Sequence, residues 1–246
     1  MKFAYLADTT DLVPYAISAL LIDEKDWRAS YDVFKDFRKN IKRDFSLKLD
    51  EPVCFQDLAK GYGSGSMPPG KGRLFLSSFA QMLSSLPVTI VSVVSRNGGA
   101  QKDALRRRAF PILMQRIERN CEAAGGYRFA VVCGDDMNQD ICSVSRKIRV
   151  YNPLPGGSNV PMEDLIEDSF LRDLNTSHLL KSADFAAFLY RVFFLFRNGD
   201  ADSDRLLDYK ELDREFIFRI FYVWSERGIL MEKASMTNQY GMVTIR

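Results

Sequence analysis

The opening of the chain constrains the fold more than any other feature. An apolar run at residues 2–7 is followed by the polar sequence Asp-Thr-Thr-Asp and then by a second apolar run at 15–22. Two short apolar runs on either side of a polar turn predict paired strands, so we expect a hairpin. Because hairpin strands are antiparallel, a sheet that contains this pair is mixed rather than purely parallel.

The rest of the chain mixes strand patterns with long helical patterns. Further strands are expected at 88–94, 128–133 and 240–245, helices at 24–44, 74–86, 100–123, 178–196 and 208–227, and a helix with an extended end at 137–150. This mixture predicts an α/β fold in which helices flank a mixed β-sheet. The 246 residues are expected to form a single domain, with a flexible Gly/Pro loop at 61–73, another loop at 151–162 and a C-terminal helical extension from about residue 200.

Composition narrows the classes of function. A formal net charge of +2 is too small to indicate nucleic-acid binding by itself, so any basic surface must be local. The clearest basic run is Arg106–Arg108, which is either a solvated helix face or a contact for a nucleic-acid backbone. The single histidine, His178, argues against a histidine-dependent hydrolase and a histidine metal site. Enzyme chemistry here would therefore rest on carboxylates.

The cysteines and the apolar runs indicate in which cellular compartment the protein is expected. The four cysteines have no zinc-site spacing, and Cys133 lies in an apolar run where we expect a buried free thiol. No apolar run reaches the roughly 18 residues of a membrane span. We therefore expect a cytoplasmic, reduced protein that does not associate with membranes.

Two apparent ligand motifs fail on inspection. Gly65, Gly70 and Lys71 have the spacing of a P-loop, but Gly72 stands where a Ser or Thr should hold magnesium, and no strand pattern leads in. The acidic run from Asp136 resembles the start of a calcium loop but lacks the required later glycine and glutamate.

Other carboxylates occupy more suggestive positions. Asp8 ends the first strand, Asp135 and Asp136 end another, and Asp184 lies on an apolar helix. A carboxylate on such a helix is costly to bury unless it is paired or binds a cation. Acids at strand ends and on a covering helix can converge on two divalent ions about 4 Å apart, which promote phosphoryl displacement. Each acid could instead be a cap, a turn residue or a salt-bridge partner.

Three segments resemble a known family. The opening reads Tyr5-Leu6-Ala7-Asp8-Thr9-Thr10-Asp11, and later segments read Asp168-Ser169-Phe170-Leu171-Arg172-Asp173 and Leu180-Lys181-Ser182-Ala183-Asp184-Phe185-Ala186-Ala187-Phe188-Leu189-Tyr190-Arg191. Over roughly residues 1–195 the chain resembles the ribonuclease H-like "domain of unknown function" family of bacterial and phage proteins. Its members open with Tyr-Ile-Asp-Glu-Ser-Gly-Asp and carry a Gln-Leu-Ala-Asp helix motif.

The resemblance implies a ribonuclease H-like fold and a metal-dependent nuclease that acts on DNA or RNA. By position, the implied site acids that would hold Mg²⁺ or Mn²⁺ are Asp8, Asp135 or Asp136, Asp173 and Asp184. Nucleic acid is then the expected partner, and its phosphates could contact Lys181, Arg106 and Arg107.

The chain also departs from the family pattern. Ala7 occupies the place of the first aspartate, and Asp8 is a poor substitute because successive strand side chains point to opposite faces. The family's Glu-Ile-His segment is expected near residues 51–55, which here read Glu51-Pro52-Val53-Cys54-Phe55, without its histidine. Either the natural protein keeps the fold for binding alone, or an aspartate at position 7 was replaced to make an inactive form.

Three hypotheses follow. The first is a divalent-metal-dependent phosphodiesterase, inactive in this form if Ala7 removes a metal ligand. The second is a catalytically inactive nucleic-acid-binding or interaction module of a defence or mobile-element system. The third is an assembly protein, in which the aromatic stripe from Phe216 to Trp224 forms a homo-oligomer or partner surface rather than packing in the core.

Overall fold

The computed structural model of the protein describes residues 1–9, 14–48, 51–96, 101–152, 159, 161–198, 208–232 and 240–245, without the side chains of 138–140. Asp11 of the opening motif lies outside these residues, as does the start of the expected C-terminal extension. Among the described helices, none combines the length and the apolar character needed to cross a membrane.

A six-stranded mixed sheet forms the centre of the molecule, in the order β5-β4-β1-β2-β3-β6. The strands are β1 (Lys2–Asp8), β2 (Tyr15–Asp23), β3 (Val88–Ser95), β4 (Phe129–Gly134), β5 (Phe170–Arg172) and β6 (Met242–Ile245). The expected opening hairpin is confirmed, because β1 and β2 pair antiparallel, with Asp8 opposite Ile17. β3 is also antiparallel to β2, whereas β4 is parallel to β1 and to β5, and β6 is parallel to β3.

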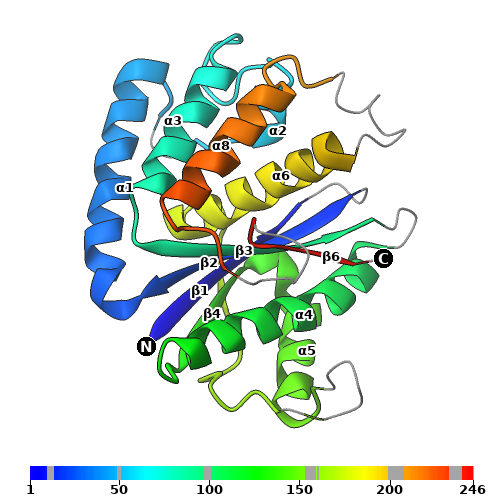
Figure 1. Ribbon diagram of the computed structural model, residues 1–246. Coiled ribbons are helices and arrows are strands. Elements are labelled where there is room, and N and C mark those ends of the chain that lie inside the picture. Colours follow the sequence, from blue (N-terminus) through cyan, green and yellow to red (C-terminus); the bar gives the residue numbers. More distant parts are fainter. Residues whose placement is uncertain are drawn as a thin grey trace.

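Helices cover both faces of this sheet (Figure 1). On one face lie α4 (Lys102–Ala123) and, beside it, α5 (Asn138–Val150), which follows the short 3₁₀ turn η1 (Asp135–Met137). The other face carries α6 (His178–Asn198), packed on β1, β2 and β3, and then α1 (Glu24–Phe45), α2 (Phe55–Ala59), α3 (Gly72–Ser84) and α8 (Arg214–Glu226). The protein is thus an α/β fold, and its strand order and directions are compatible with a ribonuclease H-like fold.

The sheet separates two hydrophobic cores, and the alternation of β1 assigns its side chains to them. Tyr5 and Ala7 belong to the core on the α6 side, whereas Ala4 and Leu6 belong to the core on the α4 side. Asp8 continues this alternation and meets α4, as its bond to Arg106 shows. The expectation that positions 7 and 8 point in opposite directions is therefore confirmed.

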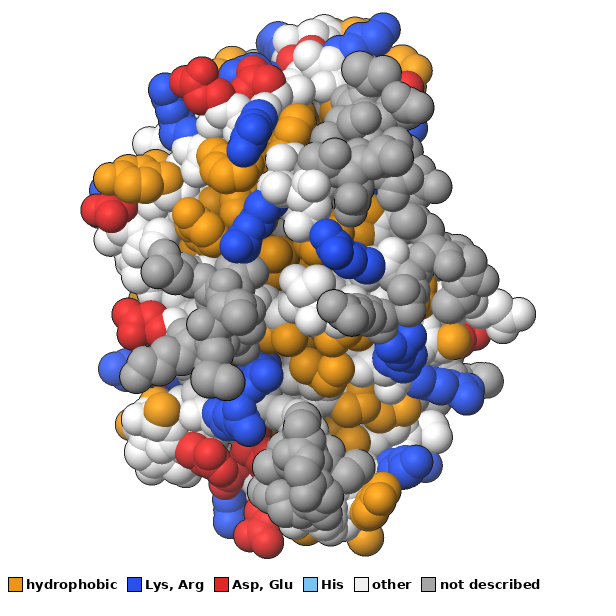
Figure 2. Space-filling model, turned by 45° about the vertical axis from the view of Figure 1, so that its right-hand side comes forward, with side chains coloured by type: hydrophobic (Ala, Val, Ile, Leu, Met, Phe, Trp, Pro, Cys, Tyr) orange, Lys and Arg blue, Asp and Glu red, His pale blue; other side chains and the backbone are white. Residues whose placement is uncertain are grey.

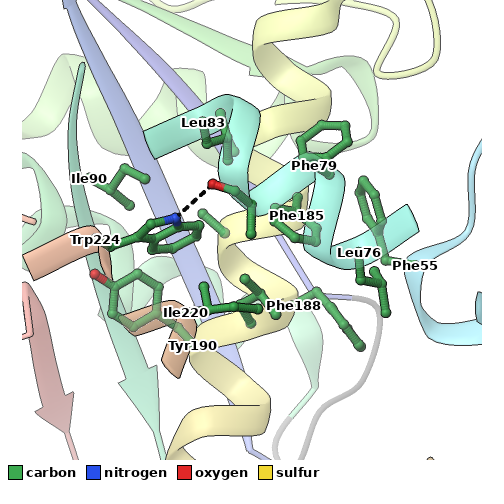
Figure 3. Packing of buried hydrophobic residues seen from close by; sticks show 14 of the residues in the cluster. Phe55, Leu76, Phe79, Leu83, Ile90, Phe185, Phe188, Tyr190, Ile220 and Trp224 are labelled. Carbon is green, nitrogen blue, oxygen red and sulfur yellow. Dashed lines mark hydrogen bonds between the residues drawn. The ribbon is translucent and has the colours of Figure 1, made fainter. Parts of the chain in front are cut away.

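The aromatic stripe of α8 lies mainly in the α6-side core. Phe216, Phe221 and Trp224 are buried, and the Trp224 Nε1 donates to the Ala80 carbonyl oxygen at 3.1 Å (Figure 3). Tyr222 on the same helix is 63% exposed. Most of the stripe therefore packs in the core, as the core-packing interpretation predicts.

Some elements differ from expectation. Residues 138–150 are helical to the end, so the extended piece predicted there is wrong. The short strand β5 was not predicted, and α8 begins six residues later than its pattern suggested, at Arg214.

Within the 61–73 loop, Ser64 and Met67 exchange backbone hydrogen bonds, and Lys71 donates to the Asp44 carbonyl oxygen. α2 rather than a strand precedes this loop, which agrees with rejecting a P-loop.

Candidate functional site

A cavity of about 490 Å³ opens where β1 and β4 end, beneath α6. Ala7 and Asp8 line it from the end of β1, Asp136 from the turn after β4, and Asp184 from α6. Residues between Pro52 and Gly65 form another part of its wall. Three of the carboxylates singled out in the sequence therefore share one cavity, as expected from acids at neighbouring strand ends and on a covering helix.

The Asp8 carboxylate is already saturated with protein donors. Its side chain is 2% exposed, and the Tyr15 hydroxyl donates to Oδ2 at 2.9 Å. Arg106 donates from Nε to Oδ2 at 2.5 Å and from Nη2 to Oδ1 at 3.1 Å. Lys102 adds its ammonium group 3.2 Å from Oδ1. Burial, together with the adjacent Asp8 carboxylate, holds the pKa of Tyr15 well above its usual value.

Arg106 joins Asp8 to Asp136. Its Nη2 also lies 2.6 Å from the Asp136 Oδ2, and its Nη1 donates to the Asp136 carbonyl oxygen at 3.0 Å. Lys102 approaches the same two acids, with its Nζ 3.6 Å from the Asp136 Oδ2. Burial alone would lower the pKa of Arg106, but the bonds to Asp8 and Asp136 more than offset that effect and raise it. The guanidinium is therefore a permanent cation between two carboxylates.

This position of Arg106 differs from both readings of the basic run. Arg106 is 5% exposed, so it belongs neither to a solvated helix face nor to a surface that could follow a nucleic-acid backbone. Arg107 and Arg108, the next two residues, are exposed on α4. The run therefore splits into one structural arginine and two surface arginines.

Asp184 has its own cation. The Lys181 Nζ donates to the Asp184 Oδ2 at 2.9 Å, one helical turn away, and lies 5.1 Å from the centre of the Phe55 ring. Burial raises the pKa of Asp184, Lys181 lowers it, and the charges of Asp8 and Asp136 raise it further. The net effect is a raised pKa, so Asp184 accepts a proton more readily than an exposed aspartate.

The other predicted acids do not line the cavity. Asp173 is exposed after β5, where its Oδ1 accepts a hydrogen bond from the Asn175 amide at 2.8 Å. Its neighbours Leu174 and Asn175 do line the cavity. Asp135 is exposed in the turn η1, one residue before Asp136.

These residues do not fit a pair of divalent ions. Ala7 contributes no oxygen ligand, and an ion that bridged Asp8 and Asp136 would have to displace the Arg106 guanidinium. Among the described residues, no group of three or more His, Cys, Asp or Glu side chains is arranged to hold a metal ion. The expected Mg²⁺ or Mn²⁺ site therefore finds no support in the arrangement of these acids.

The sequence analysis assigned no role at the site to two cations that line the cavity, Lys102 and Arg191. Lys102 lies one turn before Arg106, and positions four apart share a helix face. Arg191 lies two turns after Asp184 on α6, and its Nη1 donates to the Tyr209 hydroxyl at 2.6 Å. The helical spacing from Arg106 and Asp184 was the signal that could have found them.

No protein-family model matches the chain, and no curated protein matches its sequence. The likeness to the ribonuclease H-like family therefore rests on short motifs and on a compatible fold.

Proposed function

We propose that this chain is a nucleic-acid-binding module built on a ribonuclease H-like scaffold, without a working metal-dependent phosphodiesterase centre. The observation that carries the proposal is the Arg106 guanidinium bound to both Asp8 and Asp136. A protein cation stands there in place of the divalent ions that the resemblance implies. As parts of the same proposal, the module is cytoplasmic and belongs to a defence or mobile-element system.

Cations close to the cavity support binding of a phosphate backbone. Lys102 and Lys181 line the cavity with partly exposed side chains, although each is paired there with a carboxylate. Arg107 and Arg108 add exposed positive charge on α4. Figure 2 shows Lys and Arg side chains around the hydrophobic middle of one face of the molecule, with Asp and Glu mainly toward its left side. Such local charge attracts phosphates although the net charge is only +2.

The test is a binding and cleavage assay with fluorescein-labelled single- and double-stranded DNA and RNA. We expect binding in the presence of EDTA, a Kd that rises steeply between about 50 and 200 mM KCl, and intact substrate with Mg²⁺ or Mn²⁺. The double variant Arg107→Ala/Arg108→Ala should bind more weakly, and the slope of log Kd against log salt concentration should fall by about 1–2. The control Arg227→Ala, at the end of α8 on the other side of the sheet from α4, should change neither value. Absence of binding at low salt would refute the proposal, and metal-dependent cleavage would refute its non-catalytic part.

A nuclease is the second candidate, and one observation favours it. Ala7 lines the same cavity as Asp136 and Asp184, so an aspartate at position 7 would add a carboxylate there. If Ala7→Asp cuts nucleic acid with Mn²⁺ and the parent chain does not, the scaffold retains a nuclease site that Ala7 disables. If Ala7→Asp folds and cuts nothing, the nuclease candidate is rejected.

A further inference from the structure

A second hollow, of about 660 Å³, lies on the α6 side of the sheet next to its β5 edge. Its floor comes from three adjacent strands: Phe3 and Tyr5 of β1, Val132 of β4, and Phe170 and Arg172 of β5. α6 packs mainly on β1, β2 and β3, which leaves this part of the sheet open. We call this hollow the aromatic groove.

One wall of the aromatic groove is a stack of aromatic rings. Trp27 and Tyr31, one turn apart on α1, stack at 5.4 Å with planes 10° apart. His178 of α6 continues the stack, 6.0 Å from Tyr31. The Trp27 Nε1 donates to the Tyr5 hydroxyl at 2.8 Å, which fixes the indole against the floor. Trp27 and Tyr31 are only partly buried, so part of the wall is open to a ligand.

The opposite side of the groove is more exposed. Phe170 is 47% exposed, although it is a large apolar residue on the edge strand. Arg172 follows it two residues later and is also exposed, and its charge lies close enough to Tyr5 to affect that hydroxyl. Single exposed apolar residues are common on protein surfaces, so the relevant feature of Phe170 is its place in the lining of the groove beside Arg172.

The charges of the groove select the class of ligand. Its described lining contains Arg172 and no carboxylate. Thr176 and Ser177 line it just before α6, and His178 lines it as the first residue of that helix, whose 21 residues place the positive end of the helix dipole here. The groove therefore offers the partly exposed rings of Phe170, Trp27 and Tyr31 together with positive charge, a combination that suits nucleobases joined by phosphates.

The aromatic groove also continues toward the cavity described above. Leu174 and Asn175 line the cavity, and the next residues, Thr176 and Ser177, line the groove. A single segment thus borders both hollows. One extended strand could follow this segment from the cavity into the groove, whereas a rigid duplex could not lay its bases on the ring faces.

We propose that the aromatic groove binds single-stranded nucleic acid by stacking its bases, and that it extends the binding surface that begins at the cavity. This inference rests on the proposed nucleic-acid-binding function and adds its preferred substrate class. The choice of occupant follows from the lining: an acidic or apolar peptide added to the β5 edge would use Phe170 and Arg172 but would not require the stacked wall of Trp27 and Tyr31.

The experiment uses a fluorescein-labelled oligothymidylate and a labelled duplex with the full-length chain. We expect the single strand to bind more tightly than the duplex and to quench tryptophan fluorescence, because Trp27 is partly exposed whereas Trp224 is fully buried. Phe170→Ala should weaken oligothymidylate binding by about fivefold or more, the effect of one lost base stack, and Arg172→Ala should weaken it through the lost positive charge. Trp27→Phe should keep most of the binding and lose the quenching.

Matched controls lie on α8, away from the groove. Tyr222→Ala removes an aromatic ring that is 63% exposed, and Arg227→Ala removes an exposed arginine, so neither should change the Kd. If the parent chain binds no nucleic acid, the proposed function and this inference both fail. If it binds, but the groove variants bind equally well and no quenching occurs, only the inference fails. If the chain self-associates, and Phe170→Ala abolishes this without changing the Kd for oligothymidylate, the groove binds a second copy of the chain. That outcome would overturn the inference.

Discussion

The guanidinium of Arg106 donates to both oxygens of the Asp8 carboxylate, at 2.5 and 3.1 Å, across 98 positions of sequence. Both side chains are buried, with exposed fractions of 6% and 2%. The pair ties the end of β1 to α4 at the rim of the cavity. It also neutralises the acid that the family resemblance assigns to metal binding.

Arg106→Met should destabilise the protein strongly. The change leaves the Asp8 carboxylate buried with Tyr15 and Lys102 as its partners among the described residues, and breaking a buried ion pair from one side costs about 3–5 kcal/mol. Because Lys102 remains nearby, we expect about 3 kcal/mol, measured by urea unfolding.

Two comparisons make this test specific. Arg119→Met removes an exposed arginine from the same helix and should change the free energy of unfolding by less than about 0.5 kcal/mol. The double variant Asp8→Asn/Arg106→Met should lose less than the sum of the two single losses. A loss below about 1 kcal/mol for Arg106→Met would contradict a structural role for the pair.

Local sequence patterns predicted the elements that have strong local signals. The β1–β2 hairpin follows from two apolar runs around a polar turn, and the opposite directions of Ala7 and Asp8 follow from strand alternation. β5 has only three residues, too few to show a period, so the floor of the aromatic groove could not be predicted.

The pairing of the site was not predictable for a different reason. Charged residues carry no local mark of their partners, so the sequence left Asp8 as a metal ligand, a cap, a turn residue or a salt-bridge partner and did not identify Arg106. Only the packing of α4 against the sheet decides between these partners. The cavity itself was predictable, because acids at the ends of adjacent parallel strands lie at one edge of a sheet.

Trp224→Ala should cost about 3–5 kcal/mol, the range for removing a large aromatic side chain from a packed core. Trp224 of α8 is fully buried against α3 and α6, near Phe185 (Figure 3). Its ring lies 5.5 Å from that of Phe221. Trp224→Phe should cost less, although it leaves the Ala80 carbonyl oxygen without its indole donor. Urea unfolding measures both variants. Tyr222→Ala, which removes an exposed ring from the same helix, should be close to neutral, and an equal loss for it would contradict this account.

Glu118 should make stability depend on pH. Burial, with the charges of Glu122, Asp164 and Glu163, raises the pKa of Glu118 from 4.5 to about 7. The folded protein then holds a proton that the unfolded chain releases between these two pH values, so stability falls as the pH rises from about 4.5 to 7 and then levels off.

Glu118→Gln should remove this dependence, since a neutral amide carries no ionisation cost. At pH 8 the variant should be more stable than the parent chain by up to about 3 kcal/mol, and the difference should shrink as the pH falls toward 4.5. Urea unfolding across this range measures the effect, with the exposed Glu226→Gln as the control. A difference between Glu118→Gln and the parent that does not change with pH would contradict the raised pKa.

Ala7→Asp should create a metal response that the parent chain lacks. The new carboxylate would enter the cavity lined by Asp136 and Asp184, where an additional negative charge lowers stability until a cation binds. Mn²⁺ at about 100 times its Kd would add about 2.7 kcal/mol, or roughly 5–10 °C in Tm for a chain of this size. The parent chain and the uncharged Ala7→Asn should show no such rise, because neither adds a charged ligand.

A second substitution distinguishes two reasons for weak metal binding: the missing ligand at position 7 and competition from the Lys181 ammonium group. Lys181→Ala frees Asp184 from its ammonium partner, so Ala7→Asp/Lys181→Ala should respond to Mn²⁺ at a lower concentration than Ala7→Asp alone. Thermal unfolding followed by circular dichroism gives both values. If both variants fold and neither responds to Mn²⁺, the Arg106 ion pairs with Asp8 and Asp136 are sufficient to exclude metal, and position 7 is not the residue that decides it.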